Sequence, residues 1–169
     1  MDQDVFLTIL TKAMEIERDG FQFYRLAAER AEDAGARETF EHLAAEERRH
    51  HEALQHQVRA VLERGTWDAG AVPREDRSLD PSGDVFSDGF RRRIQGRHLE
   101  MSALSIGILL ERNAIDFYTR QADEAESEDV RRFFRELADW ETEHYRMLLR
   151  QDEALRDDYW AENRFAPLD

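Results

Sequence analysis

Apolar residues recur at helical spacing along the chain. Phe6, Leu10 and Met14 follow one another at intervals of four residues, and Phe40 and Leu43 are three apart. Apolar side chains at these intervals lie on one face of an α-helix and suit the core of a helical bundle. The surrounding sequence is rich in Ala, Leu, Glu and Arg, which favour helices. The pattern predicts an all-α chain.

A segment rich in turn-forming residues divides the chain in the middle. Two of the three prolines and four glycines lie within 65–89, so we expect a long crossover there. Gly35 is expected to end the first helix, and Ser127 to cap the last one. The predicted organisation is a single domain over 1–169, with helices near 4–33, 36–63, 99–126 and 128–155. These helices form hairpins over 4–63 and 99–155, joined by a crossover over 65–97 that includes a short helix near 85–93. A C-terminal tail over 157–169 is expected to pack on the bundle.

The second half of the chain repeats the first. Shifted by 94 residues, the stretch 10–57 matches 104–151 without a gap and with 16 identities in 48 positions, where background composition gives about 3. Glu17 pairs with Glu111, and Tyr24 with Tyr118. The sequence therefore predicts a four-helix bundle made of two duplicated helical hairpins joined by the crossover.

Composition restricts the chemistry that this bundle could carry. The absence of cysteine excludes disulfides, thiolate zinc sites, cysteine nucleophiles and cysteine-ligated iron–sulfur clusters. Any metal must be held by carboxylates and imidazoles, which favour iron, manganese or zinc. The formal net charge of −14 disfavours nucleic acid and anionic membranes as partners. The acidic N-terminus does not resemble a secretory signal, and no apolar run is long enough to span a bilayer, so we expect a cytoplasmic protein with no membrane partner.

The motif Glu-x-x-His occurs twice, once as Glu47 with His50 and once as Glu141 with His144. Residues three apart share a helix face, so a carboxylate and an imidazole can meet one metal ion there. A single match carries little weight, because about 0.7 such spacings are expected by chance in a chain of this composition. Two matches at equivalent positions of a repeat indicate a site.

Four glutamates are spaced so that they meet at one height in the bundle. Glu17 precedes Glu47 by 30 residues, and Glu111 precedes Glu141 by 30. Residues equidistant from the turn of an antiparallel hairpin lie level, and the midpoints fall near residues 33 and 127, on the predicted turns. The negative charges of four buried carboxylates must be balanced by positive charges nearby, and two divalent ions would supply four. We therefore predict a two-metal site whose ligands are Glu17, Glu47, His50, Glu111, Glu141 and His144.

These residues resemble the ferritin-like di-iron carboxylate family, and within it the rubrerythrin-type proteins. The stretches 13–24, 40–50 and 110–118 carry the resemblance, which covers about 10–60 and 100–150. It implies two iron ions, with manganese or zinc as alternatives, bridged by Glu47 and Glu141. The other glutamate and histidine of each hairpin would be terminal ligands. The resemblance also implies that Tyr24 and Tyr118 hydrogen-bond the ligand carboxylates.

The chain departs from the family pattern in three ways. Rubrerythrins proper add a cysteine-rich iron module that delivers electrons, so a chain without cysteine needs an external electron donor. They also carry an extra glutamate on the third helix, whereas Glu111 and Asp116 are the only carboxylates here between 101 and 122. Bacterioferritins bind haem through a methionine just after the first-motif glutamate, where this chain has Arg48, so no haem is expected.

Three functions suit such a site. The first is an oxidoreductase that reduces hydrogen peroxide or dioxygen as ferrous iron is oxidised, with the six metal-binding residues as its catalytic residues. The second is an iron storage protein with ferroxidase activity, and the third is a non-catalytic scaffold or sensor stabilised by metal. The sequence favours the first, and we expect a homodimer in each case.

Overall fold

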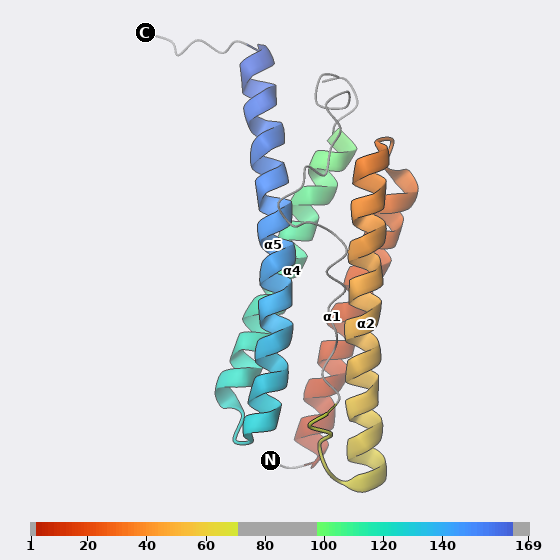
Figure 1. Cartoon of the computed structure of the whole chain (residues 1–169), viewed down its shortest axis with the longest axis vertical. Coiled ribbons are helices and arrows are strands. Elements are labelled where there is room, and N and C mark those ends of the chain that lie inside the picture. The colour runs from red at the N-terminus through yellow and green to blue at the C-terminus, as the bar shows by residue number, and fades with distance from the viewer. Residues whose placement is uncertain (1–2, 71–97, 164–169) are drawn as a thin grey trace.

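The chain folds into four long helices (Figure 1). The structure is a computed structural model, and it describes residues 3–70 and 98–163. Its helices are α1 (Gln3–Arg30), α2 (Ala34–Arg64), α4 (His98–Glu124) and α5 (Glu128–Asn163). Within these described ranges every regular element is a helix, which confirms the predicted all-α four-helix bundle.

The helices pack as two antiparallel hairpins, α1 with α2 and α4 with α5. In Figure 1, α1 and α5 run in one direction and α2 and α4 run in the other. The two first helices of the hairpins, α1 and α4, are therefore antiparallel, and they contact each other. The repeat in the sequence thus corresponds to two hairpins that face each other in opposite orientations.

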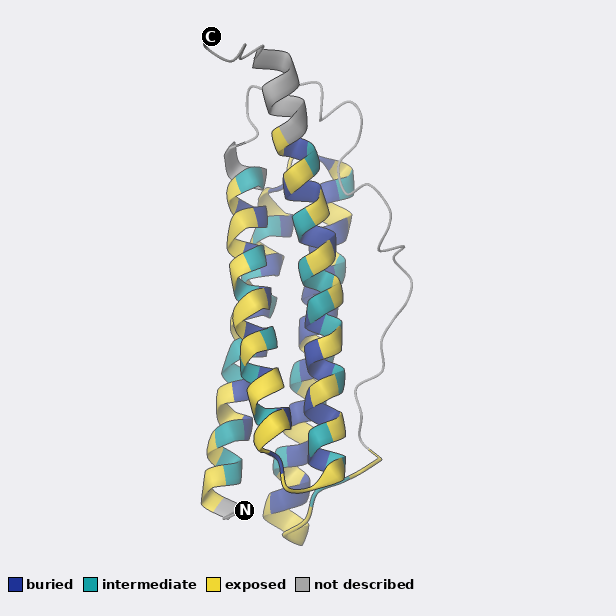
Figure 2. Ribbon diagram, turned by 90° about the vertical axis from the view of Figure 1, so that its left-hand side faces the viewer, coloured by how far each residue is buried: buried dark blue, intermediate teal, exposed yellow. Residues whose placement is uncertain are grey.

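Two apolar clusters fill the bundle, one on each side of a polar layer. The first cluster includes Tyr24, Phe40, Leu43, Leu104 and Leu148. The second includes Leu10, Leu54, Tyr118, Phe134 and Leu137. Repeat-related residues such as Leu10 and Leu104 fall in different clusters because α1 and α4 run in opposite directions. Figure 2 shows the buried residues turned toward the interior of the bundle. Glu17, Glu47, Glu111 and Glu141 are among the buried residues.

The repeat duplicates the turns as well as the helices. In the first turn the carboxylate of Asp33 accepts a hydrogen bond of 3.0 Å from the backbone N–H three residues on, as an N-cap does. Arg37 donates to the carbonyl oxygen of Ala31 at 2.7 Å. In the second turn Arg131 donates to the carbonyl oxygen of Ala125, also at 2.7 Å. Each arginine thus satisfies a backbone carbonyl in the turn that follows the first helix of its hairpin.

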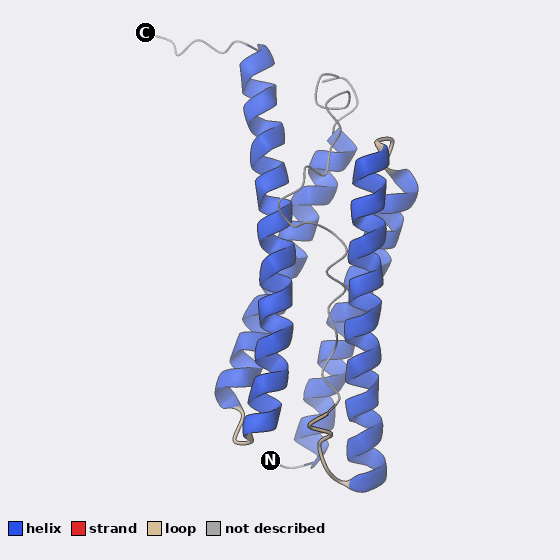
Figure 3. Cartoon of the chain, viewed as in Figure 1, coloured by secondary structure: helices blue, strands red, loops and turns tan. Residues whose placement is uncertain are grey.

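Two predictions at helix ends are wrong. Gly35 does not end the first helix, because α1 ends at Arg30 and Asp33 caps α2, which places Gly35 in the first turn of α2. The prediction that a tail begins at residue 157 is also wrong, because α5 continues as one helix through Asn163 (Figure 3). Residues 157–163 contain neither glycine nor proline, so nothing in the sequence stops the helix there.

The crossover begins at Gly65. Its φ of 65° is left-handed, and its backbone N–H donates to the carbonyl oxygen of Val61 at 3.0 Å, which closes α2. The predicted short helix near 85–93, the crossover from 71 to 97 and the end of the tail lie outside the described residues. No helix in the described ranges is both long and apolar enough to cross a membrane.

Candidate metal centre

The bundle brings together all six residues that the sequence predicts as metal ligands. Among the described residues, two groups of side chains each offer four possible ligand atoms that lie within 4.8 Å of one another. The two groups share Glu47 and Glu141. The first group adds Glu17 and His50, and the second adds Glu111 and His144. The arrangement therefore has two lobes with two carboxylates in common.

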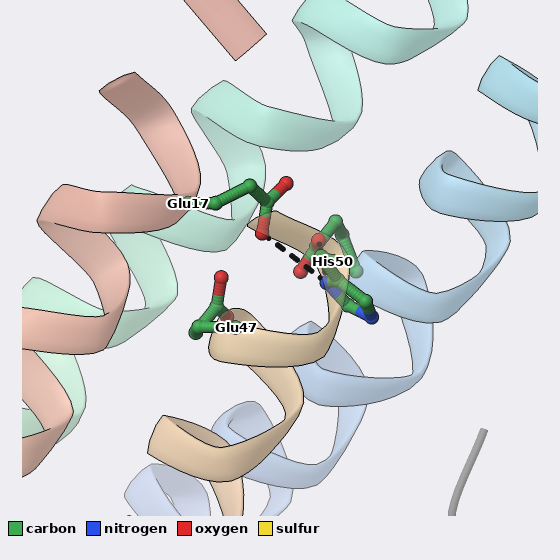
Figure 4. A group of neighbouring side chains, drawn as sticks. Glu17, Glu47 and His50 are labelled. Carbon is green, nitrogen blue, oxygen red and sulfur yellow. Dashed lines mark hydrogen bonds and ion pairs between the residues drawn. The ribbon is translucent and has the colours of Figure 1, made fainter. Parts of the chain in front are cut away.

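In the first lobe, His50 faces carboxylates from two other helices. Its Nδ1 lies 3.2 Å from Oε2 of Glu17 and 3.1 Å from Oε1 of Glu141. Figure 4 shows Glu17 reaching from α1 toward His50, with Glu47 beside them on α2. These side chains are almost completely buried. Three helices therefore contribute to this lobe.

In the second lobe, His144 takes the equivalent place. Its Nδ1 lies 3.2 Å from Oε2 of Glu141, 3.8 Å from Oε1 of Glu47 and 3.9 Å from Oε2 of Glu111. The side chain of His144 is 12% exposed, whereas that of His50 is 1% exposed. The second lobe is therefore the more accessible one.

These separations suit ligands that share a metal ion. Imidazole nitrogens and carboxylate oxygens bind metals at about 2.0–2.2 Å, so neighbouring ligand atoms around one ion lie about 3 Å apart. The nitrogen–oxygen distances of 3.1 and 3.2 Å match that spacing. Carboxylates and imidazoles without a thiolate also suit iron, manganese and zinc. The residues thus fit a pair of metal ions.

Tyr24 and Tyr118 tie the two hairpins together at the site. The hydroxyl of Tyr24 donates to Oε1 of Glu111, and the hydroxyl of Tyr118 donates to Oε1 of Glu17. Both tyrosines are fully buried, and each one bonds the glutamate of the opposite hairpin. Side chains on a helix lean toward its N-terminus, so a tyrosine two turns beyond the site reaches back to its level.

Comparison with known protein families identifies the kind of bundle. The family model described as Rubrerythrin matches residues 8–68 and 87–159, which is well over half of the chain and includes all six site residues. The chain belongs to the rubrerythrin family. Comparisons with curated proteins and with solved structures found no match.

The carboxyl groups of this rubrerythrin-family site differ in the direction in which their pKa values are shifted. Burial, together with the charges of Glu141 and Glu17, raises the pKa of Glu47 well above its usual value. Burial and Glu141 raise the pKa of Glu111 in the same way. Burial also acts to raise the pKa of Glu17, but attraction to His50 and hydrogen bonds with His50, Glu47 and Tyr118 together outweigh it and lower that pKa. Glu47 and Glu111 therefore hold their protons to higher pH than Glu17 does.

The two histidines differ as well. Burial opposes a charge on His50, but the carboxylates of Glu141 and Glu17 raise its pKa to about 10. Burial lowers the pKa of His144, and attraction to Glu111 offsets this effect only in part. Metal ions bind deprotonated ligands, so they would compete with protons for the same nitrogen and oxygen atoms.

Trp140 is a neighbour of the rubrerythrin-family site that the motifs do not indicate. It adjoins Glu141 on α5, and adjacent residues on a helix point in different directions. Its half-buried ring nevertheless stacks on His50, with ring centroids 5.1 Å apart and ring planes at 14°. His50 in turn stacks on His144 at 5.9 Å. An aromatic ring that reaches solvent is therefore in contact with an imidazole of the site.

Proposed function

We propose that this chain is a di-iron oxidoreductase that reduces hydrogen peroxide or dioxygen while ferrous iron is oxidised. The observation that carries the proposal is the pair of ligand groups that share Glu47 and Glu141. Two ions with common bridging carboxylates require such an overlap. Membership of the rubrerythrin family supports iron as the metal.

In this proposal the six residues would hold two ions, with Glu47 and Glu141 common to both groups of ligands and one glutamate and one histidine belonging to each group alone. Two divalent ions balance four carboxylates, which offsets the cost of burying those charges. Six ligating side chains on two ions leave coordination positions open for an oxidant.

The protein groups around the site position the ligands. When bound, the two ferrous ions supply the two electrons that reduce an O–O bond. Tyr118 holds the carboxylate of Glu17, and Tyr24 holds that of Glu111. Burial raises the pKa of both tyrosines well above its usual value, so both hydroxyls keep the protons that they donate. Buried apolar clusters flank the site on either side.

We propose an external electron donor and a homodimer as the partners of this protein. The chain contains no cysteine that could hold an iron–sulfur module of its own. The half-buried ring of Trp140, stacked on His50, is a direct aromatic link between the surface and the site. Sizing of the purified protein tests the dimer, and a donor is tested by its ability to reduce the oxidised centre.

Stopped-flow absorbance tests the proposed reaction. Protein loaded anaerobically with ferrous iron is mixed with hydrogen peroxide or dioxygen, and the ferric absorption is followed. We expect a rapid rise with the unmodified chain and none with Glu47→Ala. Glu52→Ala is the matched control, because Glu52 is an exposed glutamate of the same helix whose carboxylate lies 3.9 Å from Arg48. We expect it to react like the unmodified chain.

Two results would redirect the proposal. No fast oxidation in a sample shown to contain two irons per chain would exclude the oxidoreductase and leave a scaffold or sensor. Fast oxidation in a protein that sizing shows to be a large cage would indicate iron storage instead.

A further inference from the structure

A groove between α1 and α4 leads from the surface to the carboxylates of the site. Its volume is about 440 Å³. Glu47, Glu111 and Tyr24 line it, and these three residues are buried. The groove is therefore continuous with the second lobe of the metal-binding cluster, and it extends well beyond the cluster toward solvent.

Two small residues keep the groove open beside the glutamates. Gly20 and Ala114 both line it, at equivalent positions of the repeat, one turn after Glu17 and Glu111. A Cβ atom on residue 20 would lie 3.0 Å from both Cδ and Oε2 of Glu47, closer than side chains ordinarily approach. Ala114 contributes only a methyl group. A larger side chain at either position would narrow the path to the carboxylates.

The groove is much larger than hydrogen peroxide or dioxygen requires. A water molecule occupies about 30 Å³ in the liquid, and a two-oxygen molecule needs about twice that. The groove, at about 440 Å³, falls instead in the range of sites for organic molecules, which is about 300–1,000 Å³. Its size therefore fits a substrate with a carbon skeleton.

The lining indicates the chemistry of that substrate. Ile16, Leu110 and Phe117 form half-buried apolar walls. Four charged residues at the exposed rim balance in sign, since Lys12 and Arg120 face solvent with Asp19 and Asp116. A rim without net charge gives no preference for an anion or a cation. The groove therefore suits an uncharged molecule with an apolar part.

We propose that this groove binds neutral organic hydroperoxides, ROOH, as substrates of the proposed oxidoreductase. The organic group R packs against Ile16, Leu110 and Phe117, and the O–O group points toward Glu47 and Glu111. The inference rests on the proposed function, since the metal-binding cluster is the reducing end of the groove. It assigns to this chain a substrate class beyond hydrogen peroxide and dioxygen.

The reaction balances as a two-electron reduction. The O–O bond of ROOH breaks, two protons are taken up, and the products are ROH and H₂O. The two electrons come from the ferrous ions of the proposed centre, which become ferric, and the external donor restores them. The side chains of the groove orient R and leave the O–O group at the carboxylate end.

A binding experiment tests the groove without any turnover. The probe is 2-phenyl-2-propanol, the stable alcohol that cumene hydroperoxide would yield, added to the full chain as purified and followed by ligand-observed NMR. We expect binding by the unmodified chain, an affinity about tenfold lower with Leu110→Ala, which removes part of one wall, and no detectable binding with Ala114→Leu. Ser105→Leu is the control, because Ser105 is an exposed residue of α4 that does not line the groove, and it should bind normally.

The matching kinetic experiment compares cumene hydroperoxide with hydrogen peroxide as oxidants of the iron-loaded protein. We expect Ala114→Leu to slow oxidation by cumene hydroperoxide at least about tenfold more than it slows oxidation by hydrogen peroxide. Circular dichroism establishes that each variant is folded, and Leu110→Ala provides the same comparison if Ala114→Leu does not fold.

The outcomes separate this inference from the proposed function. If hydrogen peroxide oxidises the iron but cumene hydroperoxide does not, the hydroperoxide assignment is overturned and the proposed function stands. The same holds if Ala114→Leu slows oxidation by the two oxidants equally. Failure of the unmodified chain to bind the alcohol also overturns it. If neither oxidant reacts with the iron-loaded protein, the proposed function itself fails and the hydroperoxide assignment falls with it.

Discussion

At the scale of single residues, the crossed hydrogen bonds of Tyr24 and Tyr118 each join the two hairpins through a buried glutamate. Tyr118→Phe leaves Oε1 of Glu17 without its hydroxyl donor, and an unsatisfied buried acceptor costs about 1–3 kcal/mol. We expect the free energy of unfolding in urea to fall by about that amount. Tyr145→Phe, which removes a hydroxyl from a half-buried position on α5, is the control and should change it by less than about 0.5 kcal/mol. Equal losses in the two variants would contradict the role given to Tyr118.

The contact between Trp140 and His50 makes tryptophan fluorescence a reporter of metal binding. We expect Co²⁺ or ferrous iron to quench the fluorescence of the unmodified chain, and Trp140→Phe to lose most of that quenching. Trp67→Phe is the matched control and should keep it, because Trp67 lies beyond the end of α2 and packs on Phe133, with ring centroids 4.9 Å apart. Quenching that depends on Trp67 rather than Trp140 would contradict the geometry.

The sequence predicts which polar residues converge but not all of their contacts. Glu17, Glu47 and His50 meet for two reasons that the residue numbers give. The helical period places Glu47 and His50 on one face of their helix, and the distance of each residue from the turn places Glu17 level with them in the hairpin. The crossed pairing of Tyr24 with Glu111 depends on how α1 is rotated against α4, which the numbers do not give. The same holds for Gly20, whose importance appears only when the neighbouring carboxylate is seen.

At the scale of elements, the turn after α1 depends on the cap provided by Asp33. Asp33→Ala removes the acceptor for a backbone N–H at the start of α2 and should lower the free energy of unfolding by about 1 kcal/mol. Asp33→Asn keeps a capping oxygen and should cost much less. Urea unfolding of both variants measures the difference, and identical losses would show that the negative charge matters rather than the cap.

Helix positions were predictable from the sequence, whereas helix ends were less so. The two hairpins follow from the repeat and from the apolar pattern that includes Leu10 and Leu43. The ends depend on local competition: Asp33 captures the N-terminus of α2 and leaves Gly35 inside the helix. At the other end, α5 continues because no residue up to Asn163 breaks it. A glycine marks where a helix is able to end, not where it must end.

At the scale of the whole molecule, the buried charges make the stability of the metal-free protein depend on pH. The pKa of His50 is raised from 6.5 to about 10, and those of Glu47 and Glu111 are also raised. From pH 7 to about 10, the folded chain therefore binds more protons than the unfolded chain, and stability falls as pH rises. His144 and Glu17 have lowered pKa values, so above pH 7 they are deprotonated in both states and do not reverse the trend.

Thermal unfolding in the presence of a chelator tests whether the stability of the metal-free protein falls as pH rises. We expect Tm of the metal-free protein to fall steadily between pH 7 and pH 10. Metal-loaded protein should show a higher Tm and a weaker fall, because bound ions replace the protons and stabilise only the folded state. A Tm that rises with pH in the metal-free protein would contradict the charge distribution described for His50 and the glutamates.

In the proposed centre, six side chains from four helices hold two metal ions as one pair. The most direct measurement is iron content together with the Mössbauer spectrum of protein loaded anaerobically with isotopically enriched ferrous iron and then oxidised. We expect two irons per chain that behave as one exchange-coupled pair, and loss of the pair when Glu47 and Glu141 are both replaced by alanine. One iron per chain, or two irons without coupling, would contradict a shared centre bridged by these carboxylates.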